Sequence, residues 1–184
     1  IMSNKLIQTI KLQKVIPIIG KGTKSQITNK FNRLVSESYN LIEITLRSDE
    51  ALETAIKLKE QNPNINIGIG SIKSLSVLEE VIKLKFDFYV SPGINQKMLE
   101  ISKKNNIFYI PGVSTPSEIL TALEYGFKIL KYFHAEQNGG AQSLKVLDDI
   151  YNEILFIPTG GINKDNMKNY FNLNNVIAVG STNI

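Results

Sequence analysis

The chain has 184 residues, 42% of them apolar and 21% charged, a balance typical of one folded domain rather than of a disordered chain. Its net charge is +4, but the lysines lie singly along the sequence and do not cluster with aromatic residues, so no nucleic-acid-binding surface is expected. The absence of Cys excludes disulfides and thiolate chemistry and suits a cytoplasmic protein, and no apolar run approaches the ~20 residues that would cross a membrane.

Short apolar runs rich in β-branched residues recur every ~20 to 26 residues, and each precedes a stretch of helical periodicity. They predict eight strands, at residues 15–19, 41–46, 65–69, 88–91, 107–110, 129–133, 154–159 and 176–179. A further helix is predicted before them at residues 3–14, where it could close the floor of a barrel. Because each strand is nearly all apolar, we expect parallel strands covered by helices.

Eight alternating strands and helices fit either a (β/α)8 TIM barrel or an open doubly wound sheet. The even spacing and the count of eight favour a single α/β barrel domain over residues 1–184. The helix expected after the eighth strand is missing, because the sequence stops at Ile184, and we interpret this as a truncated or incompletely recorded chain.

One predicted helix has chemical signals at both of its ends. Residues 115–118 read Thr-Pro-Ser-Glu, which offers an N-cap hydroxyl, a proline at the first helical position and a glutamate for a capping box. Gly126 lies where a residue in the left-handed conformation would end the same helix.

The second predicted strand carries polar residues at alternate positions. Side chains alternate along a strand, so Glu43, Thr45 and Arg47 would share one face and the apolar side chains the other. The apolar face would meet the helices, which leaves the polar face pointing into the barrel. Buried charges are costly unless they are paired, so this face indicates either a structural Glu–Arg pair or a functional site.

Lys131 lies in the middle of the apolar sixth strand, although lysine is among the residues least often buried. Its amine could reach solvent past the strand end, or the strand could be an exposed edge. Alternatively, Lys131 is a nucleophile, whose pKa burial and a nearby cation such as Arg47 would lower towards the neutral amine. The presence of Glu43 and Arg47 on a facing strand favours this last interpretation.

The last two predicted strands end in small residues. Gly160 and Gly161 follow the seventh strand, and Gly180 and Ser181 follow or end the eighth. Backbone amides at such positions can approach an anion closely, and barrels commonly hold phosphate there, so a phosphate site is predicted. A tight turn between strand and helix is the alternative.

His134, the only histidine, follows the sixth strand and is a secondary candidate, because a lone histidine is more often structural or solvated. No group of His and carboxylate residues has the spacing of metal ligands, so no metal is expected.

Seven short motifs follow one another between Val15 and Thr182. They are Glu43-Ile-Thr-Leu-Arg47, Gly68-Ile-Gly-Ser71, Val90-Ser-Pro-Gly93, Ile110-Pro-Gly-Val-Ser-Thr115, Lys131-Tyr-Phe-His-Ala-Glu136, Asn138-Gly-Gly140 and Pro158-Thr-Gly-Gly161. In this order they resemble the bacterial 2-keto-3-deoxy-6-phosphogluconate (KDPG) and 4-hydroxy-2-oxoglutarate (KHG) aldolase family. The resemblance implies a class I aldolase that cleaves KDPG to pyruvate and glyceraldehyde 3-phosphate in the Entner–Doudoroff pathway. It also implies a cytosolic homotrimer without a metal or a cofactor.

The resemblance further assigns roles to individual residues. Lys131 would form the Schiff base and Glu43 would act as the general acid and base, while Arg47 would hold the carboxylate of the pyruvyl group. The other implied contacts are hydroxyls near that carboxylate (Ser71, Thr159), a pocket wall (Pro92, Phe133) and a phosphate site (Gly160, Gly161, Gly180, Ser181).

Three departures from the family pattern concern the same pocket. His134 stands where proline is usual, Ser71 where threonine is usual, and Ser181-Thr182 where Gly-Ser is usual, which adds a Cβ at the phosphate site. Three other functions stay open: cleavage of KHG, cleavage of 2-keto-3-deoxy-6-phosphogalactonate, and binding of a sugar phosphate without catalysis. The non-catalytic barrel would be expected if Lys131 or Glu43 were missing, and both are present.

Overall fold

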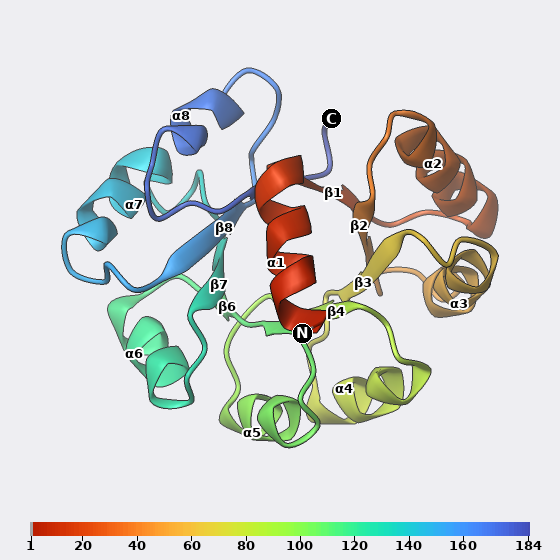
Figure 1. Ribbon diagram of the computed structural model, residues 1–184, viewed down its shortest axis with the longest axis horizontal. Coiled ribbons are helices and arrows are strands. Elements are labelled where there is room, and N and C mark those ends of the chain that lie inside the picture. The colour runs from red at the N-terminus through yellow and green to blue at the C-terminus, as the bar shows by residue number, and fades with distance from the viewer. Residues whose placement is uncertain (1) are drawn as a thin grey trace.

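The structure, a computed structural model that describes residues 2–184, is a barrel of parallel strands surrounded by helices (Figure 1). Its strands are β1 Val15–Ile19, β2 Leu41–Thr45, β3 Asn66–Gly70, β4 Phe88–Val90, β5 Tyr109–Ile110, β6 Gly112–Val113, β7 Ile129–Phe133, β8 Leu155–Thr159 and β9 Val179–Ser181. They are ordered β5-β4-β3-β2-β1-β9-β8-β7-β6, and neighbouring strands are parallel. This order confirms the predicted barrel and rules out the open doubly wound sheet.

The barrel closes through one strand that Pro111 divides into β5 and β6. Proline has no N–H to continue a ladder, but its carbonyl oxygen accepts a hydrogen bond of 2.9 Å from the backbone N–H of Lys131. Because β5 pairs with β4 and β6 pairs with β7, the two halves join the ends of the sheet. The fifth predicted strand is therefore correct in existence, but it begins later than residue 107 and continues past the proline.

Two other predicted strands differ from the structure at their ends. β2 ends at Thr45, and Arg47 lies in the loop that follows it. The eighth predicted strand meets β8 only at an isolated bridge between Phe156 and Val176, and the regular strand β9 begins at Val179. The remaining predicted strands are confirmed to within a residue or two, because their apolar runs are buried between the barrel and its helices.

The helices cover the outside of the barrel, as Figure 1 shows. They are α2 Lys24–Ser36, α3 Ala51–Gln61, α4 Leu75–Val81 with the short 3-10 helix η1 Ile82–Leu84, α5 Gln96–Lys104, α6 Pro116–Glu124, α7 Gly140–Asp148 and α8 Met167–Phe171. Ile42 and Ile44 of β2 pack outward into a core with Phe31 and Leu34 of α2, which confirms the predicted apolar face. Among residues 2–184, none of the helices is long and apolar enough to span a bilayer.

The predicted ends of α6 are both observed. Thr115 caps the helix, and the carboxylate of Glu118 accepts hydrogen bonds from the backbone N–H groups of Ser114 (2.7 Å) and Thr115 (2.9 Å). Gly126 has φ +81°, the left-handed conformation that glycine adopts without strain. The capping box therefore fixes where the chain leaves β6 and turns into α6.

Helix α1 (Met2–Gln13) lies across one end of the barrel, as predicted for residues 3–14 (Figure 1). Its Leu6 and Ile10 are buried in a core with Ile16 of β1 and Phe88 of β4. The side chain of Gln13 donates to the carbonyl oxygens of Val15 and Leu41, each at 2.8 Å, and accepts a hydrogen bond from the backbone N–H of Leu41. These contacts hold α1 on the amino-terminal end of β1 and β2.

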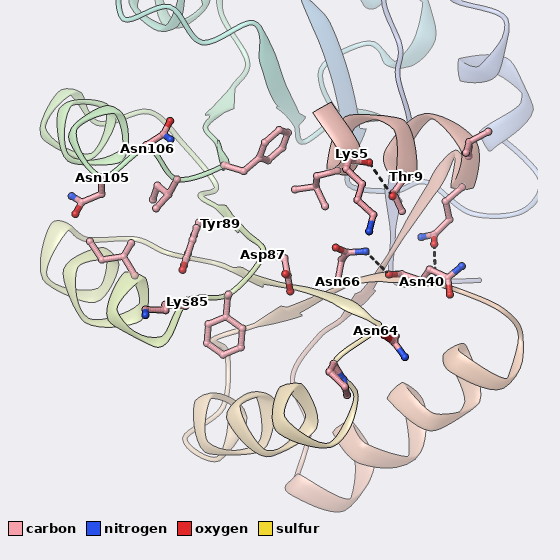
Figure 2. Close-up of a pocket in the computed structure, with 18 of the residues that line it drawn as sticks. Lys5, Thr9, Asn40, Asn64, Asn66, Lys85, Asp87, Tyr89, Asn105 and Asn106 are labelled. Carbon is pink, nitrogen blue, oxygen red and sulfur yellow. Dashed lines mark hydrogen bonds between the residues drawn. The ribbon is translucent and has the colours of Figure 1, made fainter. Parts of the chain in front are cut away.

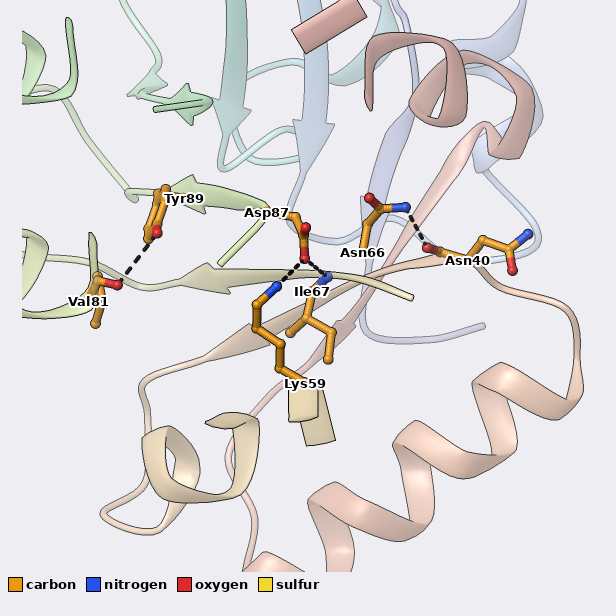
Figure 3. Close-up of polar contacts among 7 residues, drawn as sticks. All are labelled: Asn40, Lys59, Asn66, Ile67, Val81, Asp87 and Tyr89. Carbon is orange, nitrogen blue, oxygen red and sulfur yellow. Dashed lines mark hydrogen bonds and ion pairs between the residues drawn. The ribbon is translucent and has the colours of Figure 1, made fainter. Parts of the chain in front are cut away.

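A groove of about 1540 Å³ lies beside α1 at the same end of the barrel (Figure 2). Asparagine side chains and Lys5, Thr9 and Asp87 line it. Asp87 accepts hydrogen bonds from Lys59 Nζ and from the backbone N–H of Ile67, both at 2.9 Å (Figure 3). The acidic group of the groove is thus engaged in holding β3 and β4 together.

Candidate active site

The interior of the barrel contains a buried ion pair. Lys131 on β7 and Glu43 on β2 come from strands that are not neighbours in the sheet, so they meet across the barrel interior. The Lys131 Nζ lies 3.7 Å from the Glu43 Oε1, and the two side chains are 5% and 4% exposed. Such burial excludes both the solvent-reaching lysine and the exposed edge strand considered from the sequence.

Glu43 Oε1 is buried and forms no hydrogen bond within the described residues. A carboxylate oxygen in a dry interior normally accepts hydrogen bonds, and one that does not is costly unless it has another purpose. The pair is therefore poorly explained as a structural staple. An acid beside an amine, with an oxygen free to accept a proton, is the arrangement needed for acid–base chemistry at that amine.

Gly70, the last residue of β3, makes the space that Glu43 occupies. A Cβ at Gly70 would lie 1.9 Å from Glu43 Oε1 and 2.6 Å from its carboxyl carbon, so any side chain at this position would displace the carboxylate. The sequence alone does not single out Gly70, although a glycine inside a strand can mark a close approach of another group. Its neighbour on β2 in the ladder is Thr45, whose hydroxyl donates to the carbonyl oxygen of Ile19.

Arg47 does not lie on the inward face of β2, and the expected Glu–Arg strand face is wrong in this respect. The strand ends two residues earlier, and Arg47 is exposed at the barrel mouth. Its Nε donates a hydrogen bond of 2.9 Å to the hydroxyl oxygen of Ser71, which follows β3. Arg47 and Ser71 thus form one polar unit just after β2 and β3, and Arg47 does not pair directly with Glu43.

Phe133, the last residue of β7, lies beside the lysine, and Pro92 follows β4. The Lys131 Nζ is 5.1 Å from the centre of the Phe133 ring, a distance at which a cation is attracted by the ring face. Pro92 is half-buried, and its backbone packs so tightly on Gly112 that a Cβ there would lie 2.4 Å from the Pro92 carbonyl carbon. The Phe133 ring is thus next to the amine, and Pro92 packs on Gly112, the partner of Lys131 in the ladder.

A hydrogen-bond chain holds the loop that contains Pro92. The hydroxyl of Tyr109 donates to Ser91 Oγ, and Ser91 Oγ donates to the carbonyl oxygen of Gly93, each at 2.7 Å. Burial raises the pKa of Tyr109 to about 12, against the opposing effect of its hydrogen bond to Ser91. The phenol therefore stays protonated and keeps donating at neutral pH.

The predicted phosphate residues come together at the ends of β8 and β9. Thr159 pairs with Gly180, and a Cβ at Gly180 would lie 2.4 Å from the Thr159 hydroxyl oxygen. Gly160 and Gly161 have φ +104° and +76°, and in residues 2–184 no acceptor takes a hydrogen bond from either backbone N–H. Two free amides at a strand end provide the donors that an anion needs.

Ser181 is buried, and its hydroxyl serves the backbone. It donates to the carbonyl oxygen of Ile162 at 2.7 Å and accepts from the N–H of Asn183 at 3.0 Å. The extra side chain expected at this position therefore ties β9 to the loop after β8.

A second contact supports the same loop from α8. Tyr170 donates a hydrogen bond to the carboxylate of Glu136, and the Glu136 side chain packs on Gly161. Burial, and then the neighbouring carboxylate, raise the pKa of Tyr170. The sequence does not predict this pair, because residues 34 positions apart carry no local signal of contact.

Among the residues described, no three His, Cys, Asp or Glu side chains come together as metal ligands would. The described site thus consists of an amine, a carboxylate, a guanidinium, two hydroxyls and free backbone amides.

Comparison with known proteins bears on what this arrangement does. A family model described as KDPG and KHG aldolase matches residues 6–184. The chain belongs to this aldolase family. It is therefore a lyase, built on the barrel that the sequence predicted.

Individual relatives of this aldolase cover most of its length. The 2-dehydro-3-deoxy-phosphogluconate aldolase of Dickeya dadantii is 31% identical over 95% of this chain and 82% of its own. The KHG/KDPG aldolase of Escherichia coli is 30% identical over 91% of this chain and 79% of its own. A solved KDPG aldolase of Legionella pneumophila, with pyruvate captured as a covalent carbinolamine intermediate, is 30% identical, covers 96% of this chain and 85% of its own, and has a TM-score of 0.91.

Proposed function

We propose that this aldolase cleaves KDPG to pyruvate and glyceraldehyde 3-phosphate through a Schiff base on Lys131. The observation that carries the proposal is the buried pair of Lys131 Nζ and Glu43 Oε1 at 3.7 Å, whose carboxylate oxygen has no hydrogen bond within the described chain. An amine inside an apolar pocket is protected from solvent, and a carboxylate beside it can exchange protons with it.

The covalent step begins at the ketone carbon C2. The neutral amine of Lys131 adds to C2, and loss of the oxygen as water leaves a positively charged iminium. This cation withdraws the electrons of the C3–C4 bond. Covalent electron withdrawal of this kind divides one difficult step into several easier ones.

Glu43 then moves the protons. It takes the proton of the C4 hydroxyl, and the C3–C4 bond breaks. The electron pair of this bond moves towards the iminium and forms an enamine, and glyceraldehyde 3-phosphate leaves. The enamine is protonated at C3, and water releases pyruvate and restores Lys131. Proton transfer by a positioned carboxylate is typically worth ~10²–10⁴-fold in rate.

The remaining residues bind the substrate in this proposal. Arg47 and Ser71 hold the carboxylate next to the ketone, because a guanidinium can donate two parallel hydrogen bonds to it. Phe133 and Pro92 form the wall of the pocket. Thr159 and the backbone of Gly160, Gly161, Gly180 and Ser181 bind the rest of the substrate and its phosphate.

KHG is the second candidate substrate, because the family model and the E. coli relative carry both names.

We also propose, from the family resemblance, a cytosolic homotrimer acting in the Entner–Doudoroff pathway. Exposed apolar side chains on neighbouring helices support an interface between copies: Leu120 on α6, and Val146 and Ile150 on and after α7.

Trapping with borohydride tests the proposal. Incubation with pyruvate and borohydride should add a reduced pyruvyl group to Lys131, which mass spectrometry of peptides would locate. The Lys131→Met variant should bind no label and lose aldol cleavage. Lys128→Met, an exposed lysine just before the same strand, is the matched control and should behave as the wild type. A label on another lysine, or cleavage by Lys131→Met, would refute the mechanism.

A further inference from the structure

His134 lies directly after β7 and is one aromatic ring away from the catalytic amine. Its ring centre is 3.6 Å from that of Phe133, and the Phe133 ring centre is in turn 5.1 Å from the Lys131 Nζ. His134 is exposed, so its imidazole is open to solvent.

The backbone of His134 also contacts the glycine loop after β8. A Cβ on Gly160 would lie 3.2 Å from both the Cα and the Cβ of His134. The residues that follow are hydrogen-bonded to the same loop, with Ala135 N–H donating to Thr159 (2.8 Å) and Glu136 N–H to Gly160 (3.1 Å). His134 therefore lies between the Phe133 ring and the loop that contains Gly160 and Gly161.

The ring nitrogens of His134 are available for hydrogen bonding. Within residues 2–184, neither of its ring nitrogens takes part in a hydrogen bond, and the nearby carboxylate of Glu136 is engaged by Tyr170. A neutral imidazole donates through one nitrogen and a protonated one through two, so His134 can serve an anion in either state. The imidazole and the free amides of Gly160 and Gly161 thus follow two neighbouring strands, β7 and β8.

We propose that His134 is a specificity-determining residue that donates a hydrogen bond to the phosphate at the far end of the substrate. The inference rests on the proposed function, because Lys131 must hold the other end. The ring separations of 5.1 Å and 3.6 Å put the His134 ring centre within about 9 Å of the Lys131 Nζ. That separation suits a phosphate at C6 of a chain attached through C2, whereas KHG ends at C5 in a carboxylate.

Steady-state kinetics with two substrates tests this role. His134→Ala should raise KM for KDPG about tenfold with kcat nearly unchanged, the loss expected for a hydrogen bond to a charged group. Its kcat/KM for KHG should stay within about twofold of the wild type, and His134→Asn, which keeps an N–H donor, should recover most of the KDPG affinity. Gln142→Ala, an exposed neutral change on α7, is the control and should leave both substrates unaffected.

Equal losses for both substrates in His134→Ala, or an unchanged KM for KDPG, would overturn the proposal. Calorimetry with glycerol 3-phosphate separates this result from a failure of the aldolase mechanism. His134→Ala should weaken its binding about tenfold, while borohydride trapping of pyruvate on Lys131 proceeds as in the wild type. Loss of trapping in the wild type would refute the proposed function, whereas intact trapping with unchanged glycerol 3-phosphate binding would refute the role of His134 alone.

Discussion

The Glu43 side chain keeps its position because two glycines on the neighbouring strand leave room for it. Its neighbours on β3 are Gly68, opposite it in the ladder, and Gly70, over which its carboxylate lies. The absence of a Cβ at Gly70 thus allows the Glu43 carboxylate to lie next to Lys131. Interiors packed this closely transmit a small change in volume directly to the groups that react.

Gly70→Ala should therefore abolish most of the activity. The added Cβ would lie 1.9 Å from Glu43 Oε1, so the carboxylate must move away from Lys131, and we expect kcat to fall by ~10²–10⁴-fold. Gly20→Ala is the matched control, because a Cβ there has no neighbour within 4 Å, and its activity should stay within about twofold. Comparable turnover by the two variants, with circular dichroism showing both folded, would contradict this account of Gly70.

At the residue scale the sequence predicts which side chains are reactive better than it predicts which side chains touch. Lys131 and Glu43 stand out because charges inside apolar strands are rare, and both are buried together. The sequence does not indicate that β2 ends before Arg47, because the alternation of polar and apolar residues continues past the end of the strand. Nor does it pair Glu136 with Tyr170, which only the packing of α8 brings together.

The capping box of α6 makes the stability of this helix depend on pH. Burial opposes ionisation of Glu118, but hydrogen bonds from Ser114 and Thr115 outweigh it and lower the pKa of this carboxyl below its usual 4.5. A group whose pKa is lowered on folding stabilises the protein above the pKa of the unfolded state. That contribution is lost as the pH falls through the pKa of the folded state.

Glu118→Ala should accordingly destabilise the protein by about 1 kcal/mol at pH 7, the usual value of a cap. The difference from the wild type should shrink as the pH falls well below 4.5, because Glu118 is then protonated in both states. Urea unfolding at several pH values measures this, with Glu124→Ala in the last turn of the same helix as the control. A difference that stays constant with pH would mean that the charge of Glu118 contributes nothing.

Elements were predictable where local chemistry defines them. The Thr-Pro-Ser-Glu stretch and Gly126 marked both ends of α6 correctly, since caps depend on neighbours in sequence. The start of β9 at Val179 was not predictable from its apolar run. The run begins three residues earlier, where the chain touches β8 only at one bridge.

At the scale of the whole molecule, α1 completes the core that the strands enclose. Ile10 is fully buried against residues from several strands, whereas Leu12, two positions along, is 82% exposed. Ile10→Ala should lower the free energy of unfolding by about 2–5 kcal/mol, and Leu12→Ala should change it by less than about 0.5 kcal/mol. The chain has no Trp, so urea unfolding is best followed by circular dichroism. Equal effects of the two substitutions would show that α1 does not seal the barrel.

The floor formed by α1 also sets an order of events. In the part of the chain that the structure describes, Leu6 and Ile10 cover one end of the barrel, so Lys131 meets solvent through the other. After the proposed cleavage, the pyruvyl fragment stays attached at the inner position and the aldehyde lies outside it. The aldehyde must then depart first, and in the reverse direction pyruvate must enter first. A barrel closed at one end thereby makes carbon–carbon bond formation a compulsory-order reaction.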